Sequence, residues 1–473
     1  MKPHFGLIGL GTMGAALALN IVDNGFGLAV YNRTGQTTDD FIDTAGSLAE
    51  RLIATKSLTE LVASIEAPRN IILMVPAGPV VDAQIDALAP LLGPDDLIID
   101  AGNANFHDTN RRAQQAAETG RLFFGLGVSG GEEGARFGPS MMAGGPAGVY
   151  DRLRPLLDAI AAKDPKGQPC VDRMGEGGAG HFVKMVHNGI EYADMQMIAE
   201  VYGILRDGHQ ASAEQIASAF EQFNQGPLSS YLIEISGKVA RVNDAESSRP
   251  LLDMIVDAAG QKGTGRWTAI EAQQMGTAIP VIEAGVAARN VSAQRDFRQQ
   301  AESVYSAGPQ ALEQPFSAQE LESALLAGKV ICYAQGFAMM AAAKQHFGWS
   351  LPLPRVAQVW RAGCIIRAEL LEPIAAAMAD DPTRNLILAP SFIDLLKERV
   401  PALRHVVTTS LASGIPVTAL SSALGWFDMA RTGRSTANML QAQRDFFGAH
   451  GFRRTDREGD FHGPWAQAYA SQT

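Results

Sequence analysis

The segment GHFVKMVHNGIEYADMQMIAE, residues 180–200, predicts a long helix that carries a polar stripe among apolar faces. Four polar residues recur at spacings that place them on one side of a helix: Lys184, His187, Asn188 and Glu191. The other faces are predicted core and carry Phe182, Val183, Met185, Val186, Ile190 and Met195. A polar stripe is usually a solvated face. These four groups, kept in a row on an otherwise apolar helix, also suggest a functional site.

The same segment marks a change in the character of the chain. Before it, short apolar runs alternate with amphipathic segments: FGLIGL (5–10), LAVYNR (28–33), NIILMVPA (70–77), DLIIDAGN (96–103) and FFGLGVSGG (123–131). That alternation predicts βα units and a parallel sheet. After it, long helical periodicities predict an all-α domain. We therefore expect an α/β domain over 1–178, an all-α domain over 179–435 and an extended C-terminal tail over 436–473.

The totals limit the kind of protein this is. A chain of 473 residues exceeds one ordinary core, so two or three domains are expected. Apolar residues make up 46% and charged residues 19%, which is a globular balance. The 39 basic and 50 acidic residues give a formal net charge of −11, which argues against a nucleic-acid or anionic-membrane partner.

Targeting and metal signals are weak. The N-terminus superficially resembles a signal peptide, but its regularly spaced glycines fit a strand–turn–helix better, and no apolar run is long enough to span a membrane. The three cysteines, Cys170, Cys332 and Cys364, are scattered and lack a C-x-x-C spacing, which predicts a reducing, cytoplasmic compartment. No spacing of histidines, cysteines or carboxylates suggests a metal site.

A dinucleotide site is predicted at the first two runs. GLGTMG places Gly9, Gly11 and Gly14 where a tight turn would let a pyrophosphate approach a helix N-terminus. The second run ends in Asn32-Arg33-Thr34, where an NAD site usually carries an acid. Arg33 would pair with a 2′-phosphate. Alone, each motif could be a glycine-rich turn or a surface arginine; together they favour NADP over NAD.

Three further loops carry candidate binding groups. DAGNAN (100–105) and GVSGGEEGA (127–135) end predicted strands at the ligand-binding edge of the sheet; Asn103 offers an amide and Ser129-Gly130-Gly131 offers backbone N–H groups. AGQKGTGRWT (259–268) is not a P-loop, but its Lys262 and Thr264 side chains could together bind a phosphate group. Arg289, Arg444 and His450 could complete a cationic cluster, although single arginines are usually surface residues.

A weak internal repeat lies inside the helical region. VKMVHNGIEYADM (183–195) can be aligned with GKVICYAQGFAMM (328–340), and this alignment pairs Lys184 with Lys329 and Tyr192 with Phe337. The rest of the polar stripe is absent from the second copy. The segment from 441 to 465 is basic, aromatic and glycine-rich, which predicts an extended tail that docks on another surface.

Together these motifs resemble the decarboxylating 6-phosphogluconate dehydrogenases over essentially the whole chain. The resemblance is carried, in order and at matching separations, by NRT (32–34), GVSGGEEGAR (127–136), GAGHFVKMVHNGIEYADMQ (178–196), GQKGTGRW (260–267) and QRDFFGAH (443–450). It implies a Rossmann-type domain, a duplicated helical domain, and a homodimer in which each tail threads into the partner. The implied reaction, a step of the pentose phosphate pathway and of gluconate use, converts 6-phospho-D-gluconate and NADP⁺ to ribulose 5-phosphate, CO₂ and NADPH.

The resemblance also implies roles for individual residues. Lys184 would take the proton from the hydroxyl on carbon 3, and after CO₂ leaves Glu191 would protonate carbon 1 of the resulting enediol. The implied substrate residues are Asn103, Ser129, Gly130, Gly131, His187, Asn188, Tyr192, Lys262, Thr264, Arg289, Arg444 and His450. The implied cofactor residues are Gly9, Gly11, Thr12, Met13, Gly14, Asn32, Arg33, Thr34, Val75, Ala77 and Asn103. No metal is implied.

These roles require unusual pKa values. A useful base titrates near neutrality, whereas lysine titrates near 10.4, and a useful acid must titrate above the ~4.3 of glutamic acid. Burial on an apolar helix shifts both pKa values in the required directions because desolvation disfavours either charged form. That would explain why the stripe is not a solvated face.

The chain departs from the family pattern at four places. Gly11 stands where alanine is common, Pro76 replaces a lysine, Ala101 and Ala104 alter the usual DGGNS, and Phe452 replaces a tyrosine of the tail. The first three touch cofactor contacts, so they bear on the preference for NADP over NAD. The implied substrate set is intact.

Two other functions fit parts of the pattern. An NADP-dependent dehydrogenase of a simple 3-hydroxy acid would keep Lys184, but such relatives have one helical repeat and a shorter chain. A catalytically idle NADP-binding or scaffold protein would need no acid–base pair, and the retention of Lys184 with Glu191 argues against it.

Overall fold

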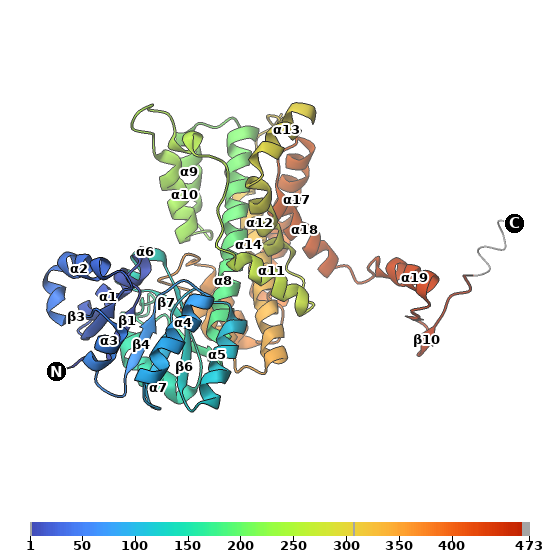
Figure 1. Cartoon of the computed structure of the whole chain (residues 1–473). Coiled ribbons are helices and arrows are strands. Elements are labelled where there is room, and N and C mark those ends of the chain that lie inside the picture. The colour runs from blue at the N-terminus through green and yellow to red at the C-terminus, as the bar shows by residue number, and fades with distance from the viewer. Residues whose placement is uncertain (1, 306–307, 466–473) are drawn as a thin grey trace. The chain divides into compact units, whose positions relative to one another are not determined.

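The computed structural model describes residues 2–305 and 308–465, and the chain forms two compact units, residues 1–423 and 424–473. The first unit contains a sheet with its covering helices and a large set of further helices (Figure 1). The second unit contains a short helix and a two-stranded hairpin. Each unit is described by itself.

The sheet has eight strands in the order β3-β2-β1-β4-β5-β6-β7-β8. The strands are β1 (Phe5–Ile8), β2 (Leu28–Tyr31), β3 (Leu52–Ala54), β4 (Asn70–Leu73), β5 (Leu97–Asp100), β6 (Leu122–Ser129), β7 (Ser140–Gly144) and β8 (Val171–Gly175). Neighbouring strands run parallel except β6 and β7, which are antiparallel. The five predicted strands are confirmed. The predicted parallel sheet is confirmed for the strands from β1 to β6; β3, β7 and β8 were not predicted, and β7 runs antiparallel to β6.

Helices cover both faces of this sheet. They are α1 (Thr12–Asp23), α2 (Gly35–Thr44), η1 (Gly46–Arg51), α3 (Leu58–Ser64), α4 (Pro79–Leu88), η2 (Ala89–Leu91), α5 (Phe106–Glu118), α6 (Gly131–Phe137) and α7 (Ala147–Ile160). Leu17 of α1 and Leu153 of α7 belong to the core on one face, and Leu61 of α3 and Val81 of α4 to the core on the other. Burial on both faces is why the central strands are continuous apolar runs rather than alternating ones.

The rest of the first unit is helical. Its elements are α8 (Ala179–Gly203), η3 (Ile204–Gly208), α9 (Ala213–Phe223), α10 (Tyr231–Arg241), η4 (Leu251–Met254), α11 (Thr264–Gln274), α12 (Pro280–Ser292), α13 (Arg295–Tyr305), α14 (Ala318–Phe347), α15 (Leu353–Val359), α16 (Leu371–Asp380), η5 (Leu386–Leu388), α17 (Pro390–Ala412) and α18 (Thr418–Ala430), which crosses into the second unit. The predicted change from sheet to helices falls between β8 and α8.

α8 joins the two parts of the first unit. Its first half packs on β6 and β7, and it also packs against α11, α12 and α14. Phe182 of α8 makes edge contacts with Phe106 of α5 and Phe347 of α14, so the start of α8 is held against both. Of the apolar residues predicted as core, only Met195 is exposed, at 41% of its surface. It lies on the side of α8 that Arg289 of α12 approaches.

α14 is the one described helix long and apolar enough to cross a membrane by length and composition. It starts at a capping box formed by Ser317 and Glu320 and ends at Gly348, whose φ of 68° is favoured in glycine. Of its most apolar window, 89% is buried inside the protein, which is typical of a core helix.

The second unit is organised around one carboxylate. It contains α19 (Ala437–Gly448) and the antiparallel pair β9 (Phe452–Arg453) and β10 (Asp460–Phe461). Asp445 accepts hydrogen bonds from the backbone N–H groups of Gly451 and Gly463 and from the indole of Trp465, at 2.7–2.9 Å. These bonds, with the Gly463 N–H contributing most, hold the pKa of Asp445 well below its usual range. The tail was predicted to be extended, so its folding around Asp445 corrects that expectation.

Candidate active site

The polar stripe of α8 is buried. Lys184, His187 and Asn188 expose 8%, 0% and 7% of their surfaces. The Lys184 ammonium donates to the Ser129 hydroxyl at 2.9 Å and lies 3.3 Å from Nδ1 of His187, whose Nε2 is 3.2 Å from the same hydroxyl. The stripe therefore faces the end of β6, where Ser129 lies, and not the solvent.

Burial shifts the pKa values of the two titrating ends of the stripe in opposite directions. Burial lowers the pKa of Lys184 from its usual value, against the opposing charge of Glu191. Burial raises the pKa of Glu191, against the opposing charges of Lys184 and Arg289. Burial, reinforced by Lys184, holds the pKa of His187 well below its usual value. Burial therefore shifts the pKa values of all three groups in the direction of their uncharged forms.

The loop after β5 meets the stripe at Asn188. The Asn188 amide donates to the Asn103 side-chain oxygen over 3.4 Å, and Asn188 Oδ1 lies 3.1 Å from Nδ1 of His187. Nδ1 of His187 lies 3.6 Å from the Glu191 carboxylate. The structure thus brings Asn103 from the sheet and the four stripe residues from α8 into one continuous set of contacts.

The loop that carries Ser129, Gly130 and Gly131 is held from behind by a segment that the sequence motifs did not point to. Gly130 has a φ of 111° and packs so closely on the carbonyl of Gly363 that a side chain would not fit. The same carbonyl accepts from the N–H of Ser140, whose hydroxyl donates to the carbonyl of Val359. The segment from Trp360 to Arg367 therefore positions the loop. A usable signal was the run of small residues at 362–364 among large ones.

A cationic group forms on the other side of the stripe. The Arg289 guanidinium lies 3.6 Å from the ring centroid of Tyr192 and donates to the carbonyl of Gly260 over 3.1 Å. Gly263, with a φ of 93°, caps α11, and Thr264 is the first residue of that helix. Lys262 is exposed in the same loop. Tyr192, Lys262, Thr264 and Arg289 thus lie together, where a helix N-terminus and two cations favour an anion.

The dinucleotide motif has the geometry expected of it. A side chain at Gly9 would clash with the Met74 carbonyl, and one at Gly14 with the Gly9 carbonyl, so both positions require glycine. At Gly11 a side chain would meet no protein atom, which leaves space for a pyrophosphate at the start of α1, where Thr12 and Met13 lie. The Asn32 side chain accepts from the N–H of Leu10, and this fixes the end of β2 against the motif. Arg33 and Thr34 are exposed beyond it.

Val75 and Ala77 follow β4, which lies beside β1 in the sheet. The strand order reverses between β1 and β4, so these two residues lie across that point from the glycine motif that follows β1. That point is where open α/β sheets bind dinucleotides. The residues present therefore fit a phosphorylated dinucleotide.

Arg444 and His450 lie in the second unit, and both are exposed there. Arg444 donates to the Gln441 side chain over 3.2 Å, and the ring of His450 is 5.9 Å from that of Phe447. Neither residue belongs to the set of contacts around α8, so their contribution to a substrate site is a proposal.

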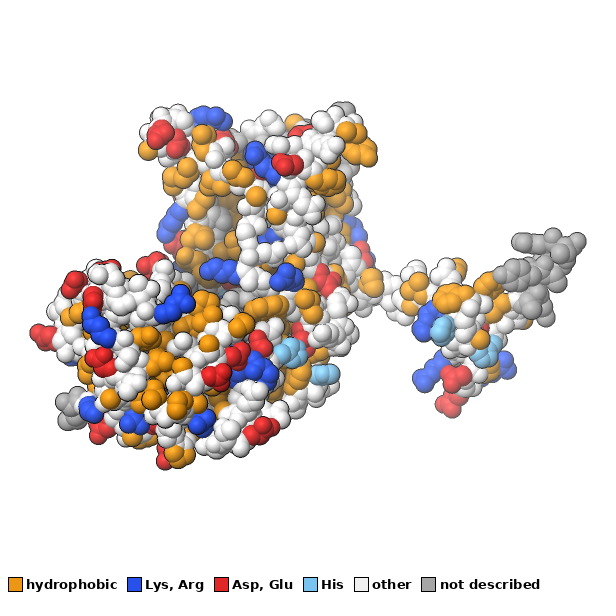
Figure 2. Space-filling view, in the orientation of Figure 1, with side chains coloured by type: hydrophobic (Ala, Val, Ile, Leu, Met, Phe, Trp, Pro, Cys, Tyr) orange, Lys and Arg blue, Asp and Glu red, His pale blue; other side chains and the backbone are white. Residues whose placement is uncertain are grey.

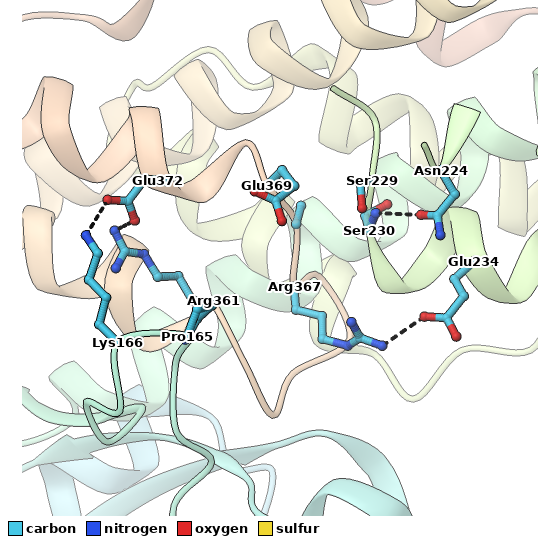
Figure 3. A pocket seen from close by; sticks show the side chains of 11 residues that line it. Pro165, Lys166, Asn224, Ser229, Ser230, Glu234, Arg361, Arg367, Glu369 and Glu372 are labelled. Carbon is cyan, nitrogen blue, oxygen red and sulfur yellow. Dashed lines mark hydrogen bonds and ion pairs between the residues drawn. The ribbon is translucent and has the colours of Figure 1, made fainter. Parts of the chain in front are cut away.

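Another cavity of the first unit is lined in part by Arg361 and Arg367, from the segment that supports the Ser129 loop (Figure 3). It is lined by Pro165, Lys166, Asn224, Ser229, Ser230, Glu234, Arg361, Arg367, Ala368, Glu369 and Glu372. Lys166 and Arg361 both point to Glu372, and Arg367 pairs with Glu234 at 3.0 Å. Its cations are thus already neutralised by carboxylates, and Lys166 and Arg361 tie the sheet part of the unit to the helical part.

Within residues 2–305 and 308–465, no group of three or more histidines, cysteines or carboxylates is arranged to hold a metal ion.

The chain is similar to known proteins over nearly its whole length. The family model for the NAD binding domain of 6-phosphogluconate dehydrogenase matches residues 4–175, and that for the C-terminal domain of the same enzyme matches residues 180–465. An NADP⁺-dependent, decarboxylating 6-phosphogluconate dehydrogenase of Bacillus subtilis is 45% identical over 469 residues, which cover 98% of this chain and 99% of the relative. An NAD⁺-dependent enzyme of the same name and species is 45% identical over 472 residues, covering 99% of this chain and all of the relative.

The fold is also that of a solved structure. The 6-phosphogluconate dehydrogenase of Plasmodium falciparum, studied in its apo form and in complexes with NADP⁺ and with 6-phosphogluconate, superimposes with a TM-score of 0.94. It is 38% identical and covers 98% of this chain, and this chain covers all of it.

A dinucleotide-binding sheet beside a helix that carries a buried lysine and a partly exposed glutamic acid is the arrangement of a nicotinamide-dependent oxidoreductase. The identity over the full length specifies it further. The chain belongs to the family of decarboxylating 6-phosphogluconate dehydrogenases.

Proposed function

We propose that this chain oxidises 6-phospho-D-gluconate at carbon 3 with NADP⁺ and releases CO₂ and ribulose 5-phosphate. The observation that carries the proposal is the polar stripe on α8, in which Lys184 is buried and 20% of the Glu191 side chain is exposed. Lys184 and Glu191 have pKa values shifted toward the neutral base and the protonated acid that this reaction needs. Two adjacent loops supply groups for a sugar acid phosphate: the one at Ser129 for its carboxylate, and the one at Lys262 and Thr264 for its phosphate.

The proposed steps balance in protons. Neutral Lys184 accepts the proton of the carbon 3 hydroxyl, while NADP⁺ accepts the hydride from the same carbon. The product is a β-keto acid, which loses CO₂ because its carboxylate electrons can flow into the adjacent carbonyl. Protonated Lys184 stabilises the enolate that forms, and Glu191 donates its proton to carbon 2 of the original substrate, which becomes carbon 1 of ribulose 5-phosphate. One proton is taken up and one is given back.

His187 and Asn188 hold the substrate hydroxyls in this proposal. A neutral His187 can donate from one ring nitrogen and accept at the other, and its low pKa supports that neutral state. The Ser129 hydroxyl, already bonded to Lys184, supports the orientation of the ammonium. Glu191, with 20% of its side chain exposed, is accessible to solvent.

The choice of NADP rests on Arg33. It is exposed at the end of β2, where a carboxylate would repel a 2′-phosphate. Pro76, Ala101 and Ala104 follow β4 and β5, which lie across the point of strand-order reversal from β2. The two Bacillus subtilis relatives use different cofactors at equal identity, so overall identity does not decide the choice.

The proposal includes a homodimer in which Arg444 and His450 complete the substrate site of the partner. Apolar side chains on α11, α12 and α13, such as Ile270, Val291 and Phe297, are 48–61% exposed, and Figure 2 shows apolar side chains on the outside of the helical part. A second copy of the chain would cover such surfaces.

The domain limits at 178 and 435 and a cytoplasmic location are part of the same proposal. The first limit is supported by the end of β8 at Gly175 and the start of α8 at Ala179. The location is supported by the three cysteines, which are all free and buried.

One assay tests the reaction. Purified protein is mixed with 6-phosphogluconate and either NADP⁺ or NAD⁺, and both reduced cofactor and CO₂ are measured. Equal molar release of the two products, with NADP⁺ preferred, is expected. Reduction of NADP⁺ by a simple 3-hydroxy acid, without reaction of 6-phosphogluconate, would favour the alternative dehydrogenase and contradict the proposal.

A further inference from the structure

Arg112, in the middle of α5, is a buried cation that binds three separate acceptors. Its side chain is 1% exposed. Nε and one terminal nitrogen form a two-point contact with the Asp82 carboxylate at 2.8 and 3.0 Å. The same terminal nitrogen donates to the carbonyl of Gly78 at 2.9 Å, and the other terminal nitrogen lies 3.5 Å from the Asp100 carboxylate.

Two of these acceptors anchor loops of the dinucleotide site. Gly78 ends the loop that starts at Val75, and its φ of 90° turns the chain into α4. Asp100 ends β5, is fully buried, and accepts from the N–H of Gly102 at 3.1 Å, directly before Asn103. The two loops touch, because a side chain on Gly102 would lie 3.1 Å from the carbonyl of Val75. Arg112 therefore fixes both loops from one point.

The helix that carries Arg112 also holds the start of the catalytic helix. The Thr109 hydroxyl lies 2.8 Å from Nδ1 of His181, which is buried one turn before Lys184. The Asn110 side chain accepts from the N–H of Gly178, at the N-terminus of α8. α5 is thus a common support for the two loops and for α8.

The loops after β4 and β5 lie across the reversal point from Arg33, so they face the half of the dinucleotide that does not carry the 2′-phosphate. That half contains the nicotinamide. We propose that Arg112 is a positioning residue that sets the distance and angle between the nicotinamide and the substrate carbon held by Lys184. The proposal rests on the proposed function, because it assumes that a hydride moves at that point.

Only an arginine satisfies this arrangement. Three acceptors around one side chain need several donors in a fixed planar fork, which a lysine ammonium does not provide. A buried carboxylate such as Asp100 also needs a cation beside it, so a neutral residue at 112 would leave its charge unpaired. Arg112→Lys keeps the charge and removes the fork, which makes it the informative variant.

The chain supplies a matched control. Arg111, the neighbouring residue on α5, also contacts Asp82, at 3.0 Å, but its side chain is 44% exposed. Its other hydrogen-bond and ion-pair partners are Gln115 and Asp108, which belong to α5 itself. Arg111→Lys therefore changes the same carboxylate contact without loosening the two loops.

The test measures binding and hydride transfer separately. Arg112→Lys should bind adenosine 2′,5′-bisphosphate, which lacks the nicotinamide half, within about twofold of wild type, but should bind NADPH more weakly. With 6-phosphogluconate, kcat should fall roughly ten- to a hundredfold, as expected for a misplaced reacting group. The deuterium isotope effect with substrate labelled at carbon 3 should rise, because hydride transfer becomes slower. Arg111→Lys should change none of these values more than twofold.

Several outcomes would overturn the proposal. An unchanged isotope effect and kcat in Arg112→Lys would do so, and so would an equal loss of binding for both nucleotides, which would indicate a general loss of structure. If Arg112→Lys does not fold, Asp82→Asn weakens the same fork from a half-exposed position and should shift the isotope effect and NADPH binding in the same directions; no shift contradicts the proposal. A wild-type protein inactive on 6-phosphogluconate would contradict the proposed function instead, and the two nucleotide affinities would still test Arg112.

Discussion

Lys329 of α14 and Asp194 of α8 form an ion pair of 3.1 Å in the interior of the helical part, with side chains 2% and 4% exposed. Lys329 is the residue that the internal repeat aligns with Lys184. It lies 3.4 Å from the Ser230 hydroxyl and has the Asp194 carboxyl group beside it, whereas Lys184 lies beside the Ser129 hydroxyl and His187. Lys329 thus has a fixed ion-pair partner within the protein, which suits a structural role rather than contact with a substrate.

Breaking this pair should destabilise the protein strongly. Lys329→Met leaves Asp194 buried without a cation, and unpaired buried charges typically cost about 3–5 kcal/mol. Denaturant unfolding would measure the decrease in unfolding free energy. The double variant Lys329→Met with Asp194→Leu should recover much of it, because neither residue then carries a buried charge. A decrease below about 1 kcal/mol in the single variant would mean that the pair is solvated.

Removal of Arg33 should weaken NADP⁺ binding far more than NAD⁺ binding. Arg33→Ala removes a charge-assisted bond to the 2′-phosphate, of about 1.5–3 kcal/mol, or roughly ten- to a hundredfold in the KM for NADP⁺. The KM for NAD⁺, measured on the same preparation, is the internal control. An equal rise for both cofactors would show that Arg33 supports the fold of the loop and does not read the phosphate.

Glu200 predicts a pH dependence of stability. It is buried on α8 and accepts from the backbone N–H groups of Ala419 and Leu420, at the start of α18. Burial raises the pKa of Glu200 from 4.5 to about 7, although these N–H groups oppose the rise. The folded state thus binds this proton more tightly than the unfolded state. Protonation of Glu200 therefore stabilises the folded state. This contribution is complete below the pKa that Glu200 has in the unfolded chain and is lost as the pH rises through 7.

Glu200→Gln should remove that dependence. Between pH 5 and pH 8 the wild type should lose up to about 3 kcal/mol of unfolding free energy relative to the variant. Parallel unfolding curves for the two proteins across this range would show that the carboxylate stays ionised and that the N–H groups of α18 dominate its pKa.

Mixed dimers test the proposed contribution of the tail. Lys184→Ala and Arg444→Ala should each be inactive, and the two proteins are denatured together and refolded. If the tail acts on the partner, a mixed dimer has both lesions in one site and none in the other, so a statistical mixture should regain about a quarter of the wild-type activity. No recovery, with mixed dimers confirmed by mass, would place Arg444 in its own subunit's site or outside any site.

The sequence predicted the fold where apolar runs were long. β1, β2, β4, β5 and β6 are continuous apolar segments with clear turn residues after them. β3 has three residues, and β7 and β8 contain glycine or charged residues, so their pairing depends on neighbours that are distant in sequence. The antiparallel direction of β7 likewise follows from the return of the chain after α6, which no local pattern records.

The part of the candidate site that could be predicted from the sequence is the part formed by polar side chains. Lys184, His187, Asn188 and Glu191 were identified from helical spacing, and the burial of the first three and the pKa shift of Glu191 agree with that interpretation. The segment around Gly363 was missed because it acts through a backbone carbonyl. Arg112 was missed because a single arginine in an amphipathic helix has no signature; only the structure reveals its three acceptors.

Lys184 is the general base of the proposed reaction, and Lys184→Ala tests that role when turnover and binding are measured on one preparation. Lys166→Ala, an exposed lysine at the cavity of Figure 3, is the control and should retain wild-type turnover. Turnover of 6-phosphogluconate by Lys184→Ala should fall by roughly 10²–10⁴-fold, the usual contribution of a general base, while NADPH and 6-phosphogluconate still bind. A fall of less than tenfold with both ligands bound would contradict this role, because another group would then be taking the proton.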